Sequence, residues 1–318
     1  MPKPPRGRSV ARMVSSASPP IVAAFAPGPA AYEPVDFGIA ASRITGAPLV
    51  IVSVEHGVPL LNDVVYDGDE AIARLRRKLV ARGIRDPDIR VIDDSSAARG
   101  LARALDEIKP ELIVLGASRR GTPRLLGTTA QRVLHASPCP VAIVPLGYVR
   151  PPDGVQLIGA AYAPTEEGRR ALTAALSLAR TGRVRVRAIT VLEPQAGGEE
   201  AHGLLAEQHH DVSASAGAAA RERLRAETEL REAVAAAADG VPVELDVLVN
   251  EPAQGLLSAT GQLDLLVMGS RALGPKRAVL LGSVSRRVIA ATACPVLVLP
   301  RGAAAATDAL LADAAARR

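Results

Sequence analysis

The chain has 318 residues, of which 48% are hydrophobic and 22% are charged, so it is long enough for two domains of ordinary size and is not a disordered chain. No apolar run approaches the roughly 20 residues of a membrane-spanning helix, and the start lacks the apolar block of a secretory signal, so we expect a cytoplasmic protein that does not contact membranes. The net charge of +5 lies in the tails, the core sequence is neutral, and there are only two Phe, four Tyr and no Trp, so we do not expect nucleic acid as a partner.

Residues 1–19 are rich in Pro, Arg and Ser and are expected to form a flexible basic leader. Short apolar runs then alternate with helical patterns. The expected strands of the first half are IVAAF (21–25), PLVIVSV (48–54), IRVID (89–93), ELIVLG (111–116) and PVAIVP (140–145). Between them, residues 69–82 place Ile72, Leu75 and Leu79 at three- and four-residue spacing, which predicts an amphipathic helix.

The second half repeats this order of elements. Its expected strands are LIGAAY (157–162), VRVRAITV (184–191), VELDVLV (243–249), DLLVMG (264–269) and PVLVLP (295–300). The Ala-rich segment 214–238 reads as a helix with Leu230 and Val234 on one side. Residues 303–318 form a C-terminal tail, expected to be a frayed Ala-rich helix or to dock on a partner.

The two halves are a tandem repeat of one unit. Gly127 and Gly282 are 155 residues apart, and so are the Cys-Pro pairs at 139–140 and 294–295. The repeat sets the expected domains at 20–147 and 153–302, with a Pro- and Gly-rich linker between them. Strands that are apolar on both faces and alternate with helices predict a parallel sheet covered on both sides. Each half is therefore expected to be a Rossmann-like α/β domain with a five-stranded, mostly parallel sheet.

The segment after the strand DLLVM carries the only expected ligand loop. Gly269 allows a sharp turn off the strand, and Gly282 precedes a helix whose free N–H groups attract an anion. Ser283 and Ser285 add hydroxyl groups and Arg271 adds charge. The alternative is that the glycines serve packing and Ser283 serves as a helix cap. Neither a Walker A loop nor a dinucleotide fingerprint is complete.

The stretch LLVMGSRALGPKRAVLLGSVSRRVIAATACPVLVLP (265–300) resembles the universal stress protein family, whose nucleotide-binding members carry Gly, two residues, Gly, nine residues and Gly-Ser/Thr. Both halves end in a Cys-Pro-Val strand as that family does. The resemblance implies a phosphate, ribose and adenine site on the second half's Met268, Gly269, Ala272, Gly282, Ser283, Val284, Ser285, Ala163 and Val191, to which the charge of Arg271 is added.

Two of these positions depart from the family's pattern and weaken the expected site. Ala272 replaces a glycine, and Ala163 stands where the family has an acidic residue. In the first half Arg119 replaces the same glycine, Ala26 replaces the acid, and the loop is two residues shorter. That half is expected to be mostly structural, the alternative being that Arg119 and Arg120 bind a different anion.

The resemblance implies a stress-response regulator that binds ATP, with or without Mg²⁺, in its second half and acts on a protein partner that the sequence does not identify. The alternative is a member of the family that binds no nucleotide and acts as a protein interaction module. No catalytic constellation stands out, so we expect no enzyme activity. The resemblance also implies that the last strands of the two halves pair to form an internal pseudo-dimer, which makes a homodimer of whole chains optional.

Overall fold

A computed structural model of the chain describes residues 18–27, 32–55, 68–117, 126–194, 211–270 and 282–299. The first half contains β1 (Ile21–Phe25), α1 (Glu33–Thr45), β2 (Leu49–Glu55), α2 (Gly68–Ala81), β3 (Asp88–Asp93), α3 (Ala97–Ile108), β4 (Leu112–Gly116), α4 (Thr128–Ala136) and β5 (Val141–Val144). The second half contains β6 (Leu157–Ala161), α5 (Glu166–Gly182), β7 (Arg185–Leu192), α6 (Asp211–Ala237), β8 (Val243–Val249), α7 (Pro252–Thr260), β9 (Leu265–Gly269), α8 (Ser283–Ala291) and β10 (Val296–Leu299).

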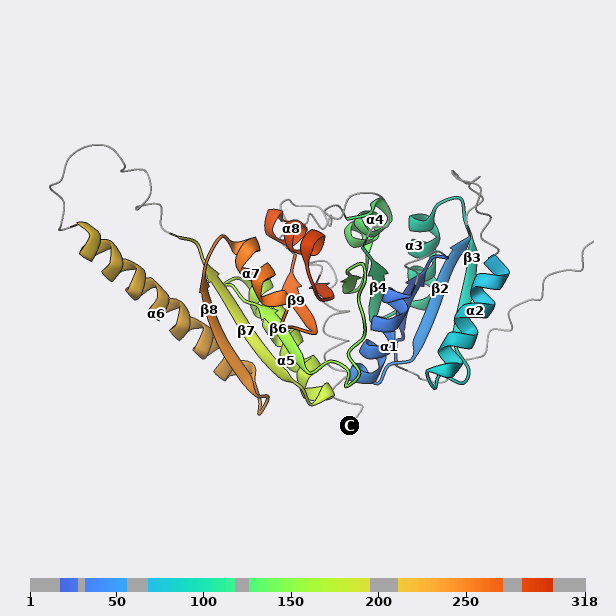
Figure 1. The fold of residues 1–318 in the computed structure, drawn as a ribbon, viewed down its shortest axis with the longest axis horizontal. Coiled ribbons are helices and arrows are strands. Elements are labelled where there is room, and N and C mark those ends of the chain that lie inside the picture. The colour runs from blue at the N-terminus through green and yellow to red at the C-terminus, as the bar shows by residue number, and fades with distance from the viewer. Residues whose placement is uncertain are drawn as a thin grey trace, which may run out of the picture.

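The strands form one continuous sheet in the order β3-β2-β1-β4-β5-β10-β9-β6-β7-β8 (Figure 1). Within each half the neighbouring strands are parallel and follow the same relative order. The halves meet where β5 and β10 pair in antiparallel fashion, with Ala142 opposite Leu297. The expected pairing of the last strands is therefore confirmed, and it joins two five-stranded sheets into one.

Helices cover both faces of this sheet, as the apolar strands predict. Buried residues of α1, α2, α5 and α6 share one hydrophobic cluster with one side of the strands. Buried residues of α3, α4, α7 and α8 share a second cluster with the other side. Figure 1 shows these two layers on opposite sides of the strands.

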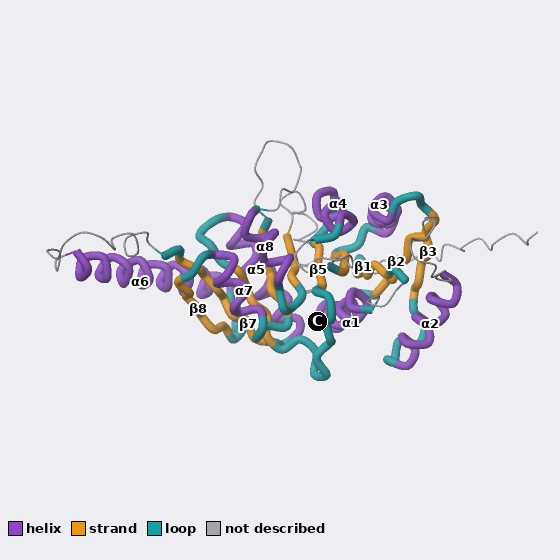
Figure 2. Tube along the Cα trace, turned by 45° about the horizontal axis from the view of Figure 1, so that its top comes forward, coloured by secondary structure: helices purple, strands orange, loops and turns teal. Residues whose placement is uncertain are grey.

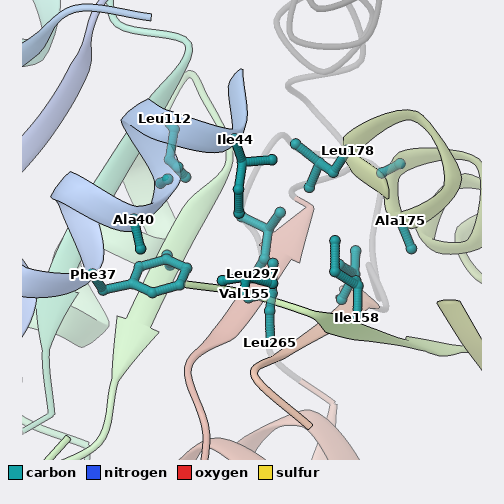
Figure 3. Packing of buried hydrophobic residues seen from close by; sticks show 14 of the residues in the cluster. Phe37, Ala40, Ile44, Leu112, Val155, Ile158, Ala175, Leu178, Leu265 and Leu297 are labelled. Atoms are coloured by element: carbon teal, nitrogen blue, oxygen red, sulfur yellow. The ribbon is translucent and has the colours of Figure 1, made fainter. Parts of the chain in front are cut away.

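The two halves share a core at their junction. Phe37 and Ile44 of α1 and Leu178 of α5 point toward one another over the sheet, where they meet Leu265 and Leu297 (Figure 3). Ile44 is 8% exposed and Leu178 5% exposed, so α1 of one half and α5 of the other bury each other. The junction is thus a continuous apolar core and not only a pair of strands.

Helix α6 lies at the β8 edge of the sheet and extends beyond the rest of the described chain (Figure 2). Its C-terminal part packs on the sheet through Leu230 and Val234, whereas Leu224 is 63% exposed. Among the described residues, no helix is both long enough and apolar enough to cross a membrane. Residues 1–17 of the leader and the whole C-terminal tail lie outside the described residues.

Candidate functional site

In each half the strand order reverses beside the central strand, between β1 and β4 in the first half and between β6 and β9 in the second. Ligands of open parallel sheets bind at such a point, outside the carboxyl ends of the strands. In the second half, Gly269 ends β9 and Gly282 precedes α8, so both glycines lie at this edge. Arg271 and Ala272 of the predicted site lie between them, outside the described residues.

Gly269 approaches the first turn of α5 closely. A Cβ added to it would lie 2.7 Å from both the Cβ and the carbonyl oxygen of Glu167. The neighbouring Met268 is 3% exposed and belongs to the core on the α7 and α8 side of the sheet. Ser270 is fully buried, and its hydroxyl donates to the carbonyl oxygen of Leu299 at 3.1 Å. This end of β9 is therefore fixed by packing, and the Met268 side chain belongs to the core, which leaves its backbone at the strand end.

The start of α8 is the part of the site that favours an anion. Gly282 is its N-cap residue, with φ −60° and ψ 163°, and no side chain caps the helix. Ser283 is exposed, Val284 is half-buried and Ser285 is 4% exposed. The first N–H groups of a helix have no partner within the helix and carry its positive dipole end. Such a helix start attracts an anion.

Of the two remaining predicted residues, Val191 lies on β7 and Ala163 follows the end of β6. Val191 follows the last paired residues of β6 and β7, which are Ala161 and Ile189. On the other side of β7, the Asn250 N–H donates to the Leu192 carbonyl oxygen at 2.9 Å. Because alternate residues of a strand direct their peptide groups to opposite sides, Val191 directs its peptide group past the end of β6. A peptide group in that position fits the hydrogen-bonding edge of a base.

Ala163, in contrast, offers no polar side chain to a ribose. Its carbonyl oxygen accepts from the Thr165 N–H at 2.7 Å, and a Cβ added to Gly168 would lie 2.2 Å from the same oxygen. The backbone at Ala163 therefore takes part in the turn that leads into α5 and packs against Gly168. The described residues of the second half thus place free helix N–H groups and the Val191 peptide group at the same edge of the sheet, without an acidic side chain at Ala163.

The first half contains a cavity of about 440 Å³ at the equivalent edge. It is lined by the ends of β1, β2 and β4 and by the start of α4, including Ala26, Val54, Gly116 and Thr128. Apart from the Thr128 and Thr129 hydroxyl groups, the described side chains of its wall are apolar. Arg119 and Arg120, which suggested a different anion, lie outside the described residues. The half predicted to be mostly structural therefore keeps space at its sheet edge.

Two cysteines occupy equivalent positions before β5 and β10, and both are buried and free. Burial raises the pKa of Cys139 to about 11 and the pKa of Cys294 to about 12, so both stay thiols at neutral pH. No cluster of three metal-binding side chains occurs within the described ranges. These cysteines pack as small apolar side chains.

Two contacts of the second half were not predicted from the sequence. One is Glu167, whose approach to Gly269 follows from no local pattern. The other is the ion pair at 2.9 Å between Arg287 of α8 and Glu251, the N-cap residue of α7. An alignment of the two repeats places Ser96 at the position of Glu251, which marks Glu251 as a difference between the halves without predicting its partner.

The strand order, the covering helices and the glycine-edged crevice define a Rossmann-like α/β protein built twice in one chain. The sequence pattern of the universal stress protein family matches residues 19–145 and again residues 155–300. The chain belongs to that family, as a member with two tandem domains.

Several relatives support this assignment. Universal stress protein Rv2319c of Mycobacterium tuberculosis strain H37Rv is 32% identical over 219 residues, covering 64% of this chain and 69% of the relative. A universal stress protein of Thermus aquaticus is 40% identical over 84 residues, covering 26% of this chain and 61% of the relative. A solved universal stress protein of Pseudomonas aeruginosa UCBPP-PA14 has a TM-score of 0.62 at 17% identity, covering 94% of this chain and 98% of that one. One from Archaeoglobus fulgidus has a TM-score of 0.57 at 20% identity, covering 90% and 99%, and both structures show the same fold.

Proposed function

We propose that the chain is a stress-response regulator that binds an adenine nucleotide, ATP with or without Mg²⁺, at the sheet edge of its second half. The observation that carries this proposal is the uncapped start of α8, with Gly282 at the N-cap and no side chain on its first N–H groups. Anions bind at such helix starts through the free N–H groups and the helix dipole. The resemblance to the family's nucleotide-binding members supplies the identity of the anion.

The role of each residue follows from its place. The N–H groups of Ser283, Val284 and Ser285 hold phosphate oxygens, and the Val191 peptide group orients the base. Since Ala163 provides no polar contact to the sugar, affinity falls below that of a site with a carboxylate there. The ligand acts by ordering this edge of the sheet and so changing the surface that a protein partner meets. The proposal is of a binding protein, without catalysis.

A calorimetric titration of ATP into three proteins tests this proposal. In Gly282→Asp the new carboxylate accepts the helix N–H groups, and we expect ATP affinity to fall at least roughly tenfold. The fold should survive, because φ −60° suits any residue and Asp is a good cap. The matched control is Gly127→Asp, the same change at the N-cap of α4, which should leave the affinity unchanged.

Equal ATP affinity in Gly282→Asp and the parent protein would contradict the proposal. A loss confined to Gly127→Asp would move the nucleotide site to the cavity of the first half. If titration with millimolar ATP gives no heat of binding in any of the three proteins, the second candidate function is favoured, which is an interaction module that binds no nucleotide. The absence of a sugar anchor at Ala163 is the observation that favours that candidate.

A further inference from the structure

The tandem repeat allows each half to serve as a reference for the other. Helices α3 and α7 begin 155 residues apart, and so do α4 and α8. The glycine within each first helix makes the same contact, because a Cβ added to Gly100 or Gly255 would lie 2.6 Å from Cγ1 of Val54 or Val191. The helix pair α3–α4 can therefore be compared residue by residue with α7–α8.

In the second half, a carboxylate joins the two helices of this pair. The Glu251 carboxylate accepts from the backbone N–H groups of Ala253 at 3.2 Å and Gln254 at 3.1 Å. It also forms an ion pair with Arg287 at 2.9 Å. Two N–H groups and one guanidinium group thus converge on one carboxylate.

In the first half the same donors are present without the carboxylate. The equivalents of the two N–H groups belong to Ala98 and Arg99, and the equivalent of Arg287 is Arg132. Ser96 stands at the position of Glu251, and its side chain makes no cap hydrogen bond. In the described part of the chain, no ion pair engages the exposed Arg132. Within the described ranges, the three donors that hold a carboxylate in the second half therefore have no such acceptor in the first.

A groove lies beside the Ala98 and Arg99 N–H groups and Arg132. Ala102 of α3 stands where α7 has Leu257, so a second side chain is shortened on the same helix. A cavity of about 530 Å³ lies between α3 and α4, lined by Ser96, Ala102 and Arg132 together with the apolar Leu105, Val133 and Pro138. Ser96 and Ala102 are six residues apart, which is about 9 Å along a helix.

We propose that this groove binds an acidic segment of a protein partner, with a Glu carboxylate on Arg132 and the α3 N–H groups, and an aliphatic side chain over Ala102. In the second half, Glu251 and Leu257 occupy the positions that these two groups of the partner would take in the first half. A small free carboxylate would be held weakly, because exposed ion pairs contribute little and salt screens them. A polypeptide also buries its aliphatic group against the apolar side chains of the groove, and this burial stabilises the complex.

The charged groups nearby leave Arg132 and the N–H groups of Ala98 and Arg99 available to a carboxylate. Asp94 is neutralised by Arg99 at 2.8 Å and by Arg103 at 3.7 Å, and it accepts from the N–H of Ser96. Its pKa is lowered by the Ser96 N–H and the arginines despite its desolvation, so it stays ionised and engaged with them. Asp106 also lines the groove, but it lies ten residues beyond Ser96, about 15 Å along the helix and past the screening length at physiological salt.

The test is an NMR titration of the full-length ¹⁵N-labelled protein at low salt. The probe is the acetylated and amidated tetrapeptide Glu-Ala-Ala-Leu, whose end residues lie about 10 Å apart when extended. We expect the amide signals of Ala98 and Arg99 to shift and saturate. The matched control lies in the same spectrum, since Ala253 and Gln254 already hold the Glu251 carboxylate and should not shift.

Three changes sharpen the test. The tetrapeptide Gln-Ala-Ala-Leu and the variant Arg132→Gln should each weaken binding roughly tenfold, because each removes the charge-assisted contact. In Ser96→Glu the chain supplies its own carboxylate, so the peptide should no longer shift the signals while the rest of the spectrum stays native. Absence of a saturable shift in the parent protein would overturn the proposal. So would equal binding of the two peptides, or equal binding by Arg132→Gln. Nucleotide binding is not required for any of these outcomes.

Discussion

An added Cβ at Gly269 would meet backbone and side-chain atoms of Glu167 at 2.7 Å, whereas one at the equivalent Gly116 would first meet Cγ of Pro34 at 3.2 Å. The first contact is closer than folded proteins tolerate, and the second requires only a small shift. Gly269 is therefore needed for the packing of α5 on β9, whatever it offers a ligand. The packing alternative raised by the sequence holds for this glycine, while Gly282 remains the ligand candidate.

This difference gives a prediction for the two glycines. We expect Gly269→Ala to lower the free energy of unfolding by about 1–3 kcal/mol, since the methyl group forces α5 away from the strand. Gly116→Ala should cost clearly less, because its nearest neighbour is a side-chain atom at 3.2 Å. Urea unfolding of both variants measures the two costs. Equal costs would show that α5 does not approach Gly269 as closely as the structure places it.

At the scale of residues, the sequence predicted that Gly269 ends a strand and that Gly282 precedes a helix, because turn chemistry is local. It could not predict that Glu167 closes on Gly269 or that Glu251 pairs with Arg287. Both contacts join residues that are distant in sequence, and no local propensity specifies them. The sequence placed Met268 beside the ligand through the family resemblance, whereas the alternation of side chains along β9 directs it into the core.

At the scale of elements, the contact of α1 with α5 connects the two halves in addition to the antiparallel pairing of β5 with β10. Leu178 of α5 lies in the junction core beside Ile44 of α1 and Leu297 of β10. Because these three elements come from both halves, a void at Leu178 weakens both at once. The unfolding of the halves should consequently be coupled.

Leu178→Ala tests this coupling. We expect the variant to lose about 2–5 kcal/mol of unfolding free energy, as buried leucines do, and to unfold in one transition at a lower temperature. The matched control is Leu224→Ala on the exposed part of α6, which should change stability by at most about 0.5 kcal/mol. Calorimetry distinguishes the outcomes. A split transition in which only one component moves would show that the halves unfold independently.

The strands were predictable as short apolar runs, most clearly in the central strands that are buried on both faces, and α2 and α6 were predictable from apolar residues at helical spacing. The antiparallel joining of β5 and β10 was not predictable in this way. Apolar runs identify a strand but not its partner, and only the family resemblance implied the pairing. The sequence also predicted α6 without indicating that Leu224 and its neighbours extend beyond the sheet, because that depends on where the sheet ends.

At the scale of the whole molecule, the tandem repeat gives two halves that share one fold and differ in their loops, cavities and helix contacts. The second half carries the longer glycine loop and closes its α7–α8 pair with Glu251 and Arg287. The first half keeps a cavity at its sheet edge and an open groove between α3 and α4. The shared core at the junction holds both halves together.

The central claim is that the second half binds an adenine nucleotide. The most direct measurement is to denature the freshly purified protein and to identify and quantify any released nucleotide by chromatography. We expect a single ATP or ADP per chain, and none from a parallel preparation of Gly282→Asp. No released nucleotide from the parent protein, followed by a flat titration at millimolar ATP, would contradict the claim and leave the glycines of this loop with packing as their role.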